Sequence, residues 1–201
     1  MGLRRISEPE GQAVTLEEVK AHLAIEFDDH DDMLEGMIAE ATDLLDGKDG
    51  ELQRCIMPQT WEWTLDDWPA ADADGGQAFK VPLPPLIEVV SIVYRDPDGA
   101  EQTLDPDAGA YQVDSTREPG WIAPGVDGWP SVQSGMNRIT ITFRAGYAGD
   151  GSSGNSPVPP TLRRLVKEMV AHMYEHRGDE GGVDLPALTR EKMDLFRVYA
   201  A

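Results

Sequence analysis

The residues best suited to chemistry are those of His172-Met-Tyr-Glu175-His176, an H-x-x-E-H pattern. Residues four apart share one face of a helix, so both imidazoles could bind one zinc ion while Glu175 activates water. A catalytic zinc site also needs a third protein ligand, and the acidic residues downstream lie in a short tail. Histidines at a helix end are common, because positive charge is favoured there. The pattern therefore favours a plain helix end, and a zinc-dependent hydrolase is kept as an alternative.

Two further groups of acidic residues could bind a metal ion. The run Asp28, Asp29, Asp31 and Asp32 has carboxylates, but it lacks the central glycine and the terminal glutamate of a calcium loop. Its position before an apolar stripe predicts a solvated run that caps a helix. Asp96-Pro-Asp-Gly99 and the segment 104–109 read as turns. We assign no metal-binding residue.

Other catalytic patterns are absent from the sequence. There is no glycine-rich phosphate loop followed by Lys and Ser or Thr, and no serine stands in a nucleophile elbow. Trp61 and Trp63 alternate with polar residues, which predicts core packing of a strand rather than base stacking. Trp121 and Trp129 stand among Gly and Pro and are better candidates for a protein contact. The sequence thus predicts no catalytic residue and no cofactor.

Composition narrows the class of protein. The chain has 201 residues, 37 acidic against 17 basic, and a net charge of −20. A surface this acidic repels phosphate, which disfavours adhesive binding to nucleic acid and leaves solubility, or a surface that DNA passes without sticking. The single cysteine, Cys55, cannot form an internal disulfide, so we expect a small buried residue in a protein made in a reducing cytoplasm.

Helices are predicted at both ends of the chain. Thr15 and Glu18 form a capping box for a helix over about 16–26, and a second helix follows through Leu34 to Leu45. A long helix is predicted from the apolar spacing 162, 165, 166, 169, 170 and 173. A last short helix is expected over 188–199, with Thr189 as its cap, whereas residues 1–13 are expected to form a flexible arm.

The middle of the chain has β character. About six short strands with turn signals between them indicate a compact antiparallel sheet or small barrel over 58–147. The predicted fold class is α+β: a small helical bundle from the N- and C-terminal helices with an inserted antiparallel β module. The expected boundaries are 1–57 for the arm and two helices, 58–147 for the β module, and 148–201 for a linker, the long helix and a C-terminal segment that folds with 1–57.

The order of these segments resembles the head–tail connector (adaptor) proteins of long-tailed bacteriophages and of phage-like gene transfer agents. Four stretches carry the resemblance in the family's order: an opening helix, a central strand with its turn, a last strand and a long helix. They are Val14-Thr-Leu-Glu-Glu-Val-Lys-Ala-His-Leu23, Leu83-Pro-Pro-Leu-Ile-Glu-Val-Val-Ser-Ile-Val-Tyr94 with Asp96-Pro-Asp-Gly99, Ile139-Thr-Ile-Thr-Phe-Arg-Ala-Gly-Tyr147, and 158–177. Residues 194–199 are similar to the family's tail, where Pro-Tyr-Arg is more usual.

The resemblance implies a structural virion protein and not an enzyme. Such proteins form a ring, usually of twelve copies, between the portal and the tail or its stopper or terminator protein, and DNA passes through it. The protein would then be made in the host bacterial cytoplasm and reside in the virion neck, without a membrane. We further hypothesise that Leu195, Phe196, Arg197, Val198 and Tyr199 dock into the portal. Trp121 and Trp129 would contact the tail side or a neighbouring copy.

Two alternatives of other classes stay open besides the hydrolase. A different virion part, such as a tail-completion or stopper protein, would be mostly β, and the predicted helices at both ends speak against it. A soluble binding module unrelated to virions would leave the apolar C-terminal residues without a role.

Overall fold

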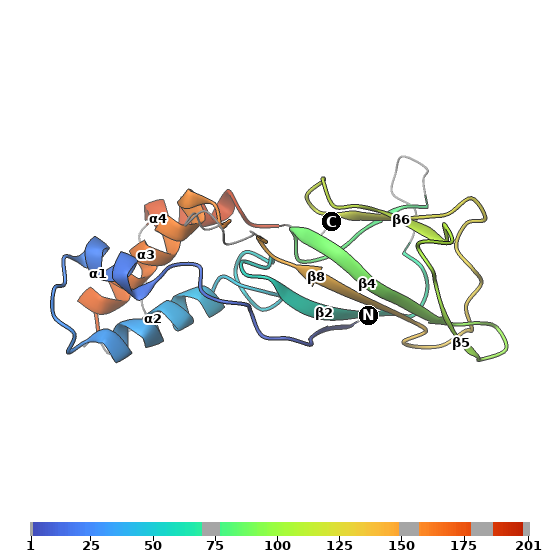
Figure 1. The fold of residues 1–201 in the computed structure, drawn as a ribbon, viewed down its shortest axis with the longest axis horizontal. Coiled ribbons are helices and arrows are strands. Elements are labelled where there is room, and N and C mark those ends of the chain that lie inside the picture. Colours follow the sequence, from blue (N-terminus) through green and yellow to red (C-terminus); the bar gives the residue numbers. More distant parts are fainter. Residues whose placement is uncertain (1, 70–76, 149–156, 178–186, 199–201) are drawn as a thin grey trace. The chain divides into compact units, whose positions relative to one another are not determined.

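The computed structural model describes residues 2–69, 77–148, 157–177 and 187–198 of the chain, which folds as two compact units (Figure 1). The sheet unit comprises Met1–Glu10 and Pro58–Gly146, and the helical unit comprises Gly11–Met57 and Tyr147–Ala201. Helices and antiparallel sheets in separate units confirm the predicted α+β class. No helix in the described ranges is long and apolar enough to cross a lipid bilayer.

The sheet unit contains two antiparallel sheets. The larger has the strand order β1-β2-β8-β4-β5, formed by β1 (Gly2–Arg5), β2 (Gln59–Leu65), β8 (Ile139–Ala145), β4 (Leu86–Arg95) and β5 (Glu101–Thr103). The smaller has the order β3-β7-β6, formed by β3 (Phe79–Lys80), β7 (Trp121–Pro124) and β6 (Tyr111–Asp114).

The interior of the larger sheet follows from strict alternation in its central strands. Every second residue of β2 and β8 is buried, and the register places Trp61 opposite Phe143 and Trp63 opposite Ile141. Residues directly opposite on one face contact each other and are the unit of sheet stability. The alternating pattern thus places both tryptophans in the core, as predicted.

The smaller sheet packs on the same core through β3. Phe79 meets Trp63 edge-on, with ring centroids 5.9 Å apart. Gly120 precedes β7, and a Cβ at this position would come within 2.6 Å of the Leu86 side chain. Glycine is therefore needed here for the close approach of the two segments.

Two expectations about the sheets were wrong. The arm predicted over 1–13 begins with a strand, because Gly2–Arg5 pairs with β2 in the register Gly2↔Thr64 to Arg5↔Trp61. The single sheet or barrel is two sheets instead, since Phe79 and Lys80 pair with β7 rather than with β4. Both errors concern pairings between distant segments, which local periodicity does not encode.

The helical unit begins with two short helices. α1 (Leu16–Leu23) has the predicted capping box, in which the Thr15 side chain accepts from the Glu18 N–H and Glu18 accepts from the Thr15 N–H. It ends earlier than predicted because Ala24 adopts a left-handed conformation with φ 56°. α2 (Asp31–Asp43) carries two acidic residues in its first turn, as expected for a helix N-terminus.

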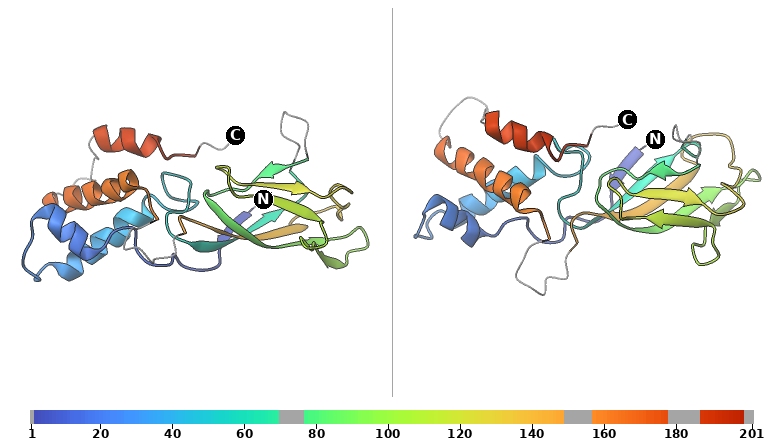
Figure 2. Two further views of the ribbon diagram at one scale, coloured as in Figure 1. Left: turned by 45° about the horizontal axis from the view of Figure 1, so that its top comes forward. Right: turned by 90° about the horizontal axis from the view of Figure 1, so that it is seen from above.

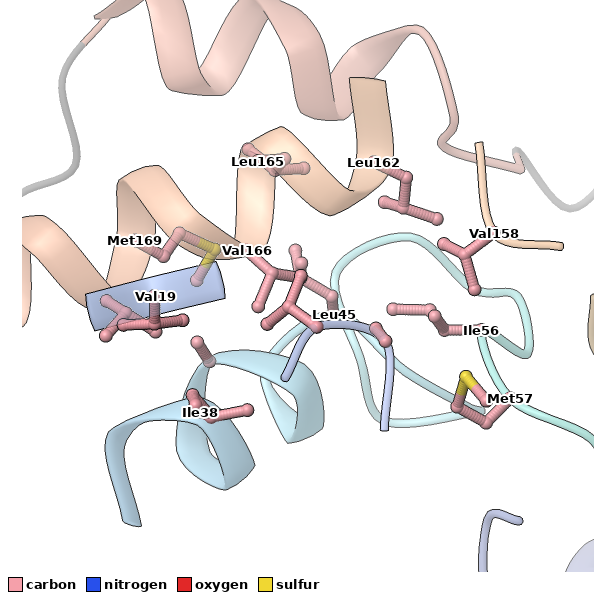
Figure 3. Close-up of a cluster of buried hydrophobic side chains, with 14 of the residues drawn as sticks. Val19, Ile38, Leu45, Ile56, Met57, Val158, Leu162, Leu165, Val166 and Met169 are labelled. Carbon is pink, nitrogen blue, oxygen red and sulfur yellow. The ribbon is translucent and has the colours of Figure 1, made fainter. Parts of the chain in front are cut away.

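The core of the helical unit forms around α3 (Pro160–Glu175). All six apolar residues whose spacing predicted this helix are buried: Leu162, Leu165, Val166, Met169, Val170 and Met173. These residues form one buried cluster with Val19 of α1, Ile38 of α2 and Leu45, which follows α2, and Figure 3 shows Val166 and Met169 among them. α3 contacts α1, α2 and α4 and thereby joins the N-terminal and C-terminal parts of the unit.

α4 (Ala187–Asp194) packs on α3, on the side away from α1 and α2 (Figure 2). Thr189 lies inside this helix and is buried, so its predicted role as an N-cap was wrong. The Glu168 carboxylate on α3 accepts from Lys192 Nζ on α4 at 2.6 Å and from Arg164 Nε at 2.8 Å. Partial burial opposes ionisation, but hydrogen bonds from Lys192 and Arg164 outweigh it and lower the pKa of Glu168.

We expect the attachment of α4 to weaken at acidic pH. A carboxyl whose pKa is lowered by folding stabilises the folded state above its ordinary pKa, and this contribution is lost as the pH falls through the lowered value. Glu168→Gln should cost about 1.5–3 kcal/mol at neutral pH, and its difference in melting temperature from wild type should shrink toward pH ~3. Thermal unfolding followed by circular dichroism between pH 3 and 7 measures both.

Glu191→Gln is the matched control, because Glu191 lies on the exposed side of α4 and makes no ion pair within the described residues. Its melting temperature should follow wild type at every pH. A constant difference between Glu168→Gln and wild type over the whole range would contradict the role given to Glu168.

Candidate functional site

The H-x-x-E-H residues lie at the end of α3. The His172 and His176 rings are neighbours, with centroids 4.1 Å apart, and His176 Nδ1 lies 2.8 Å from the His172 carbonyl oxygen. Within the described ranges, no three His, Cys, Asp or Glu side chains gather where they could hold a metal ion. Asp179, Glu180 and Asp184 lie outside the described residues. The described part of the chain thus supplies at most two imidazoles, which is fewer ligands than a catalytic zinc ion needs.

The acidic run before α2 is partly neutralised by one lysine. Lys20 Nζ donates to Asp28 at 2.6 Å and to Asp31 at 2.7 Å. The hydrogen bond from Lys20 lowers the pKa of Asp28, and hydrogen bonds to these carboxylates raise the pKa of Lys20. This arrangement joins α1 to the start of α2. His30 is the N-cap of α2 and no side chain caps the helix by a hydrogen bond, so the capping predicted for the acidic run was wrong, and the run contributes only negative charge in the first turn, through Asp31 and Asp32.

The C-terminal segment is held by Arg54, which lies in the loop after α2. The Arg54 Nε donates to the Phe196 carbonyl oxygen at 2.6 Å, and its guanidinium lies 5.6 Å from the centre of the Phe196 ring. Arg54 also donates to the Tyr147 hydroxyl. The Val198 N–H donates to the Leu52 carbonyl oxygen at 2.9 Å. The predicted docking residues Phe196 and Val198 therefore contact their own helical unit.

The remaining predicted docking residues divide into paired and exposed ones. Arg197 donates to the Glu51 carboxylate at 2.6 Å and to the Glu51 carbonyl oxygen at 2.9 Å. Leu195 is 75% exposed, although it is a large apolar residue. Tyr199 lies outside the described residues. Leu195 is consequently the described member of this group that is most accessible to another protein.

An apolar groove of about 430 Å³ lies in the same unit. Its apolar lining comes from α3, α4 and the end of α2, and its remaining lining is charged. The apolar residues are Leu44, Met169, Met173 and Met193, and the charged ones are Glu51, Arg190, Asp194 and Arg197. Methionine adapts to differently shaped partners, so a groove of this composition suits a protein contact more than a polar substrate.

Trp129 is half-buried against other aromatic side chains of the sheet unit. Its ring stacks on Trp68 with centroids 4.3 Å apart, and it also lies 5.4 Å from the centre of Phe79. Its indole N–H donates to the Gln77 carbonyl oxygen at 2.8 Å. This packing gives Trp129 a structural role that the sequence did not indicate, and makes it a poor reporter of any outside contact.

Trp121 has a different environment. It stands on β7 beside Lys80 of β3, whose Nζ lies 5.2 Å from the ring centre, and Arg117 Cζ lies 5.9 Å from it. Arg117 also forms an ion pair with Asp114 at 3.0 Å. A tryptophan with two nearby cations on a partly exposed face is a common arrangement at protein interfaces.

Sequence reasoning missed Arg54, Lys80 and the methionine groove. Arg54 and Phe196 are separated by 142 positions, and Lys80 reaches Trp121 only because β3 pairs with β7. The methionines gave a partial signal, since Met169 and Met173 were recognised as part of the α3 stripe. Their shared groove with Met193 depends on how α4 packs.

Comparison with known protein families gives a match over one part of the chain. Residues 13–61 match the family described as Phage gp6-like head-tail connector protein. No curated protein matches the sequence. The matched segment includes the capping box of α1, the acidic run, α2 and the Arg54 loop. The predicted resemblance to head–tail connectors is therefore confirmed.

Solved structures share the fold over the whole chain. A chain in the neck of an empty GTA particle, computed with C6 symmetry, is 20% identical with a TM-score of 0.73. One in the virion of a native gene transfer agent particle is 19% identical with a TM-score of 0.74, and one in a native GTA neck, computed with C12 symmetry, is 21% identical with a TM-score of 0.66. Each alignment covers 100% of this chain and 97% of the other. Residues 13–61 thus match a structural family of phage head–tail connectors, which is not a family of enzymes, and the whole chain has a fold found in gene transfer agent particles.

Proposed function

We propose that this protein is a head–tail connector that forms a closed ring, of twelve copies, in the neck of a phage-like particle. The ring joins the portal to the tail or to its stopper or terminator protein, and DNA passes through its centre. The observation that carries the proposal is the agreement of fold with chains of gene transfer agent particles over the full length of this chain. The connector-family match over residues 13–61 supports it independently.

The symmetry of those particles motivates the ring. The similar neck structures were computed with C6 and C12 symmetry. A contact between two different surfaces of neighbouring copies closes into a ring when the rotation between copies divides a full turn. Twelve copies fit both symmetries, because a twelve-fold ring also obeys six-fold symmetry.

The net charge of −20 suits a channel for DNA. Phosphate is repelled by carboxylates, so a channel lined by them lets a duplex slide without strong binding. The excess of acidic over basic residues, 37 against 17, supports passage of DNA over its capture.

The C-terminal segment is the proposed portal contact. Leu195 projects from the unit while Phe196 and Arg197 are held by Arg54 and Glu51. This arrangement presents one apolar side chain on a segment with a fixed backbone, which lowers the entropy that docking must remove. The methionine groove in the same unit offers apolar surface for a portal side chain to enter.

The first test is the assembly state. Purified protein, alone and co-expressed with a portal protein from the same genome, should give rings of about a dozen copies by negative-stain microscopy and native mass spectrometry. The central hole should exceed the roughly 20 Å width of duplex DNA. The proposed function is contradicted if the protein forms no ring and also no complex with the portal. A compact dimer with stoichiometric zinc would favour the hydrolase.

The second test concerns the portal contact. Leu195→Ala should weaken portal binding by about 2 kcal/mol, roughly thirty-fold, because a leucine side chain buried on docking is lost. Its melting temperature should stay at the wild-type value, since Leu195 makes little contact with its own unit. Deletion of α4 is a poorer test, because Met193 belongs to the core of the helical unit.

Val90→Ala serves as the control, because Val90 is an exposed apolar residue of the sheet unit. The affinities of the two variants and of wild type for immobilised portal are measured by surface plasmon resonance. Equal affinities of Leu195→Ala and wild type would refute the docking role of this residue.

A further inference from the structure

The surface around Trp121 is not needed for the core of the sheet unit. Lys80, Trp121 and Asp114 are aligned across the smaller sheet, whereas the preceding pair, Phe79 and Ile122, is buried on the opposite face. Trp121 is therefore directed away from the interior, and the cations of Lys80 and Arg117 lie near its ring. We name Lys80, Arg117 and Trp121 the Trp121 surface.

Two polar groups of this surface, the indole N–H of Trp121 and the guanidinium of Arg117, are open to a partner. In the part of the chain that the structure describes, the indole N–H of Trp121 donates no hydrogen bond, whereas those of Trp68 and Trp129 donate to carbonyl oxygens. The ion pair of Arg117 with Asp114 joins side chains that are 66% and 39% exposed. Exposed ion pairs contribute little stability, so Arg117 can turn to another carboxylate at small cost. The surface thus suits a partner that presents carboxylates around an apolar patch.

The outer face of α2 has this composition. Its exposed residues recur at helical spacing and form one stripe, Asp32, Glu35, Gly36, Ala39, Glu40 and Asp43. None of these four carboxylates forms an ion pair with a described residue. The centre of the stripe consists of small residues, with carboxylates on both sides of them. It therefore complements the Trp121 surface in charge and in shape.

Gly36 gives an independent reason to expect a close approach from outside. It lies inside α2, where glycine is among the least favourable residues. A Cβ added at Gly36 would meet no atom within 4 Å, so packing within this chain does not require glycine. Contact with a large flat side chain of another molecule would explain the absence of a side chain here.

We infer that the Trp121 surface of one copy packs on the outer face of α2 of the next copy, with the indole against Gly36 and Ala39. Lys80 and Arg117 then pair with Glu35 and Glu40. The inference rests on the proposed ring, because joining two different surfaces of the same chain is the kind of contact that closes a ring. It also offsets, at the contact itself, the repulsion between copies that each carry a charge of −20.

A charge exchange tests this contact. One variant, Lys80→Glu with Arg117→Glu, makes the Trp121 surface acidic, and a second, Glu35→Lys with Glu40→Lys, makes the α2 face basic. Each variant alone should fail to self-associate in sedimentation velocity and native mass spectrometry. An equimolar mixture should assemble again, because alternating copies restore opposite charges at every contact. Trp121→Ala should raise the dissociation constant of self-association about 30-fold, as expected of an interface tryptophan.

A control variant changes the charge equally elsewhere. Lys48→Glu with Arg95→Glu alters two exposed cations outside both surfaces and should assemble like wild type.

Cross-linking detects the contact even if self-association is weak. The Arg117→Cys protein and the Ala39→Cys protein are mixed and treated with a short bismaleimide linker. The natural Cys55 is buried and should not react. A cross-linked heterodimer is expected from the mixture, and much less product from either protein alone.

The outcomes separate this contact from the proposed function. If both charge variants form rings as the wild-type protein does, the contact is overturned and the connector function stands. The contact is also overturned if the wild-type protein does not associate and the two cysteine variants give no cross-linked heterodimer, or if the mixture of charge variants does not recover assembly. If the wild-type protein neither binds the portal nor forms rings, the connector function itself is contradicted.

Discussion

Burial of the apolar stripe of α3 is the interaction on which the helical unit depends. α1 and α4 have eight residues each and α2 has thirteen, whereas isolated helices shorter than about 12–15 residues are marginal in water. Each of the three helices contacts α3, so each is stabilised by tertiary packing and not by its own propensity. The same packing fixes the loop that bears Arg54 and, through it, the backbone of the C-terminal segment. The surface proposed to bind the portal is thus a consequence of this core.

The sheet unit depends on pairing between distant parts of the chain. β8 lies between β2 and β4, and its inward residues Ile139, Ile141 and Phe143 contact residues on both neighbours. Trp61 and Trp63 add their area to this core, and Phe79 joins the smaller sheet to it. With its inner face held in this way, the smaller sheet can direct Trp121 outward without loss of core packing.

The sequence predicted the elements whose signals are local and missed those that depend on distant partners. The α3 stripe, the Thr15 capping box and the alternation around Trp61 each lie within one segment, and all were identified correctly. β1 was missed because four residues without alternation gain their order only by pairing with β2. The tail residues were recognised from their apolar character and the family resemblance, but their contacts with Arg54 and Glu51 were not. Trp121 and Trp129 looked alike in sequence, and their different contacts, with Lys80 and Arg117 in one case and with Trp68 and Phe79 in the other, depend on segments distant in the chain.

The distribution of charge fits the proposed function, in which an acidic chain assembles and still leaves DNA free to move. The cations within the described ranges are largely engaged with carboxylates, carbonyl oxygens or aromatic rings of the same unit, as Lys20, Arg54 and Lys192 illustrate. The acidic residues outnumber the basic ones, 37 against 17, so many carboxylates have no cation to pair with. An arriving phosphate therefore meets few unpaired cations, while a second copy can still exchange weak surface ion pairs for equivalent ones. Attraction between copies then requires neither a large apolar surface nor an extended basic surface. A large apolar surface would also bind other proteins, and an extended basic surface would bind DNA. A connector needs this combination, because it must bind its neighbours firmly and the DNA that passes through it hardly at all.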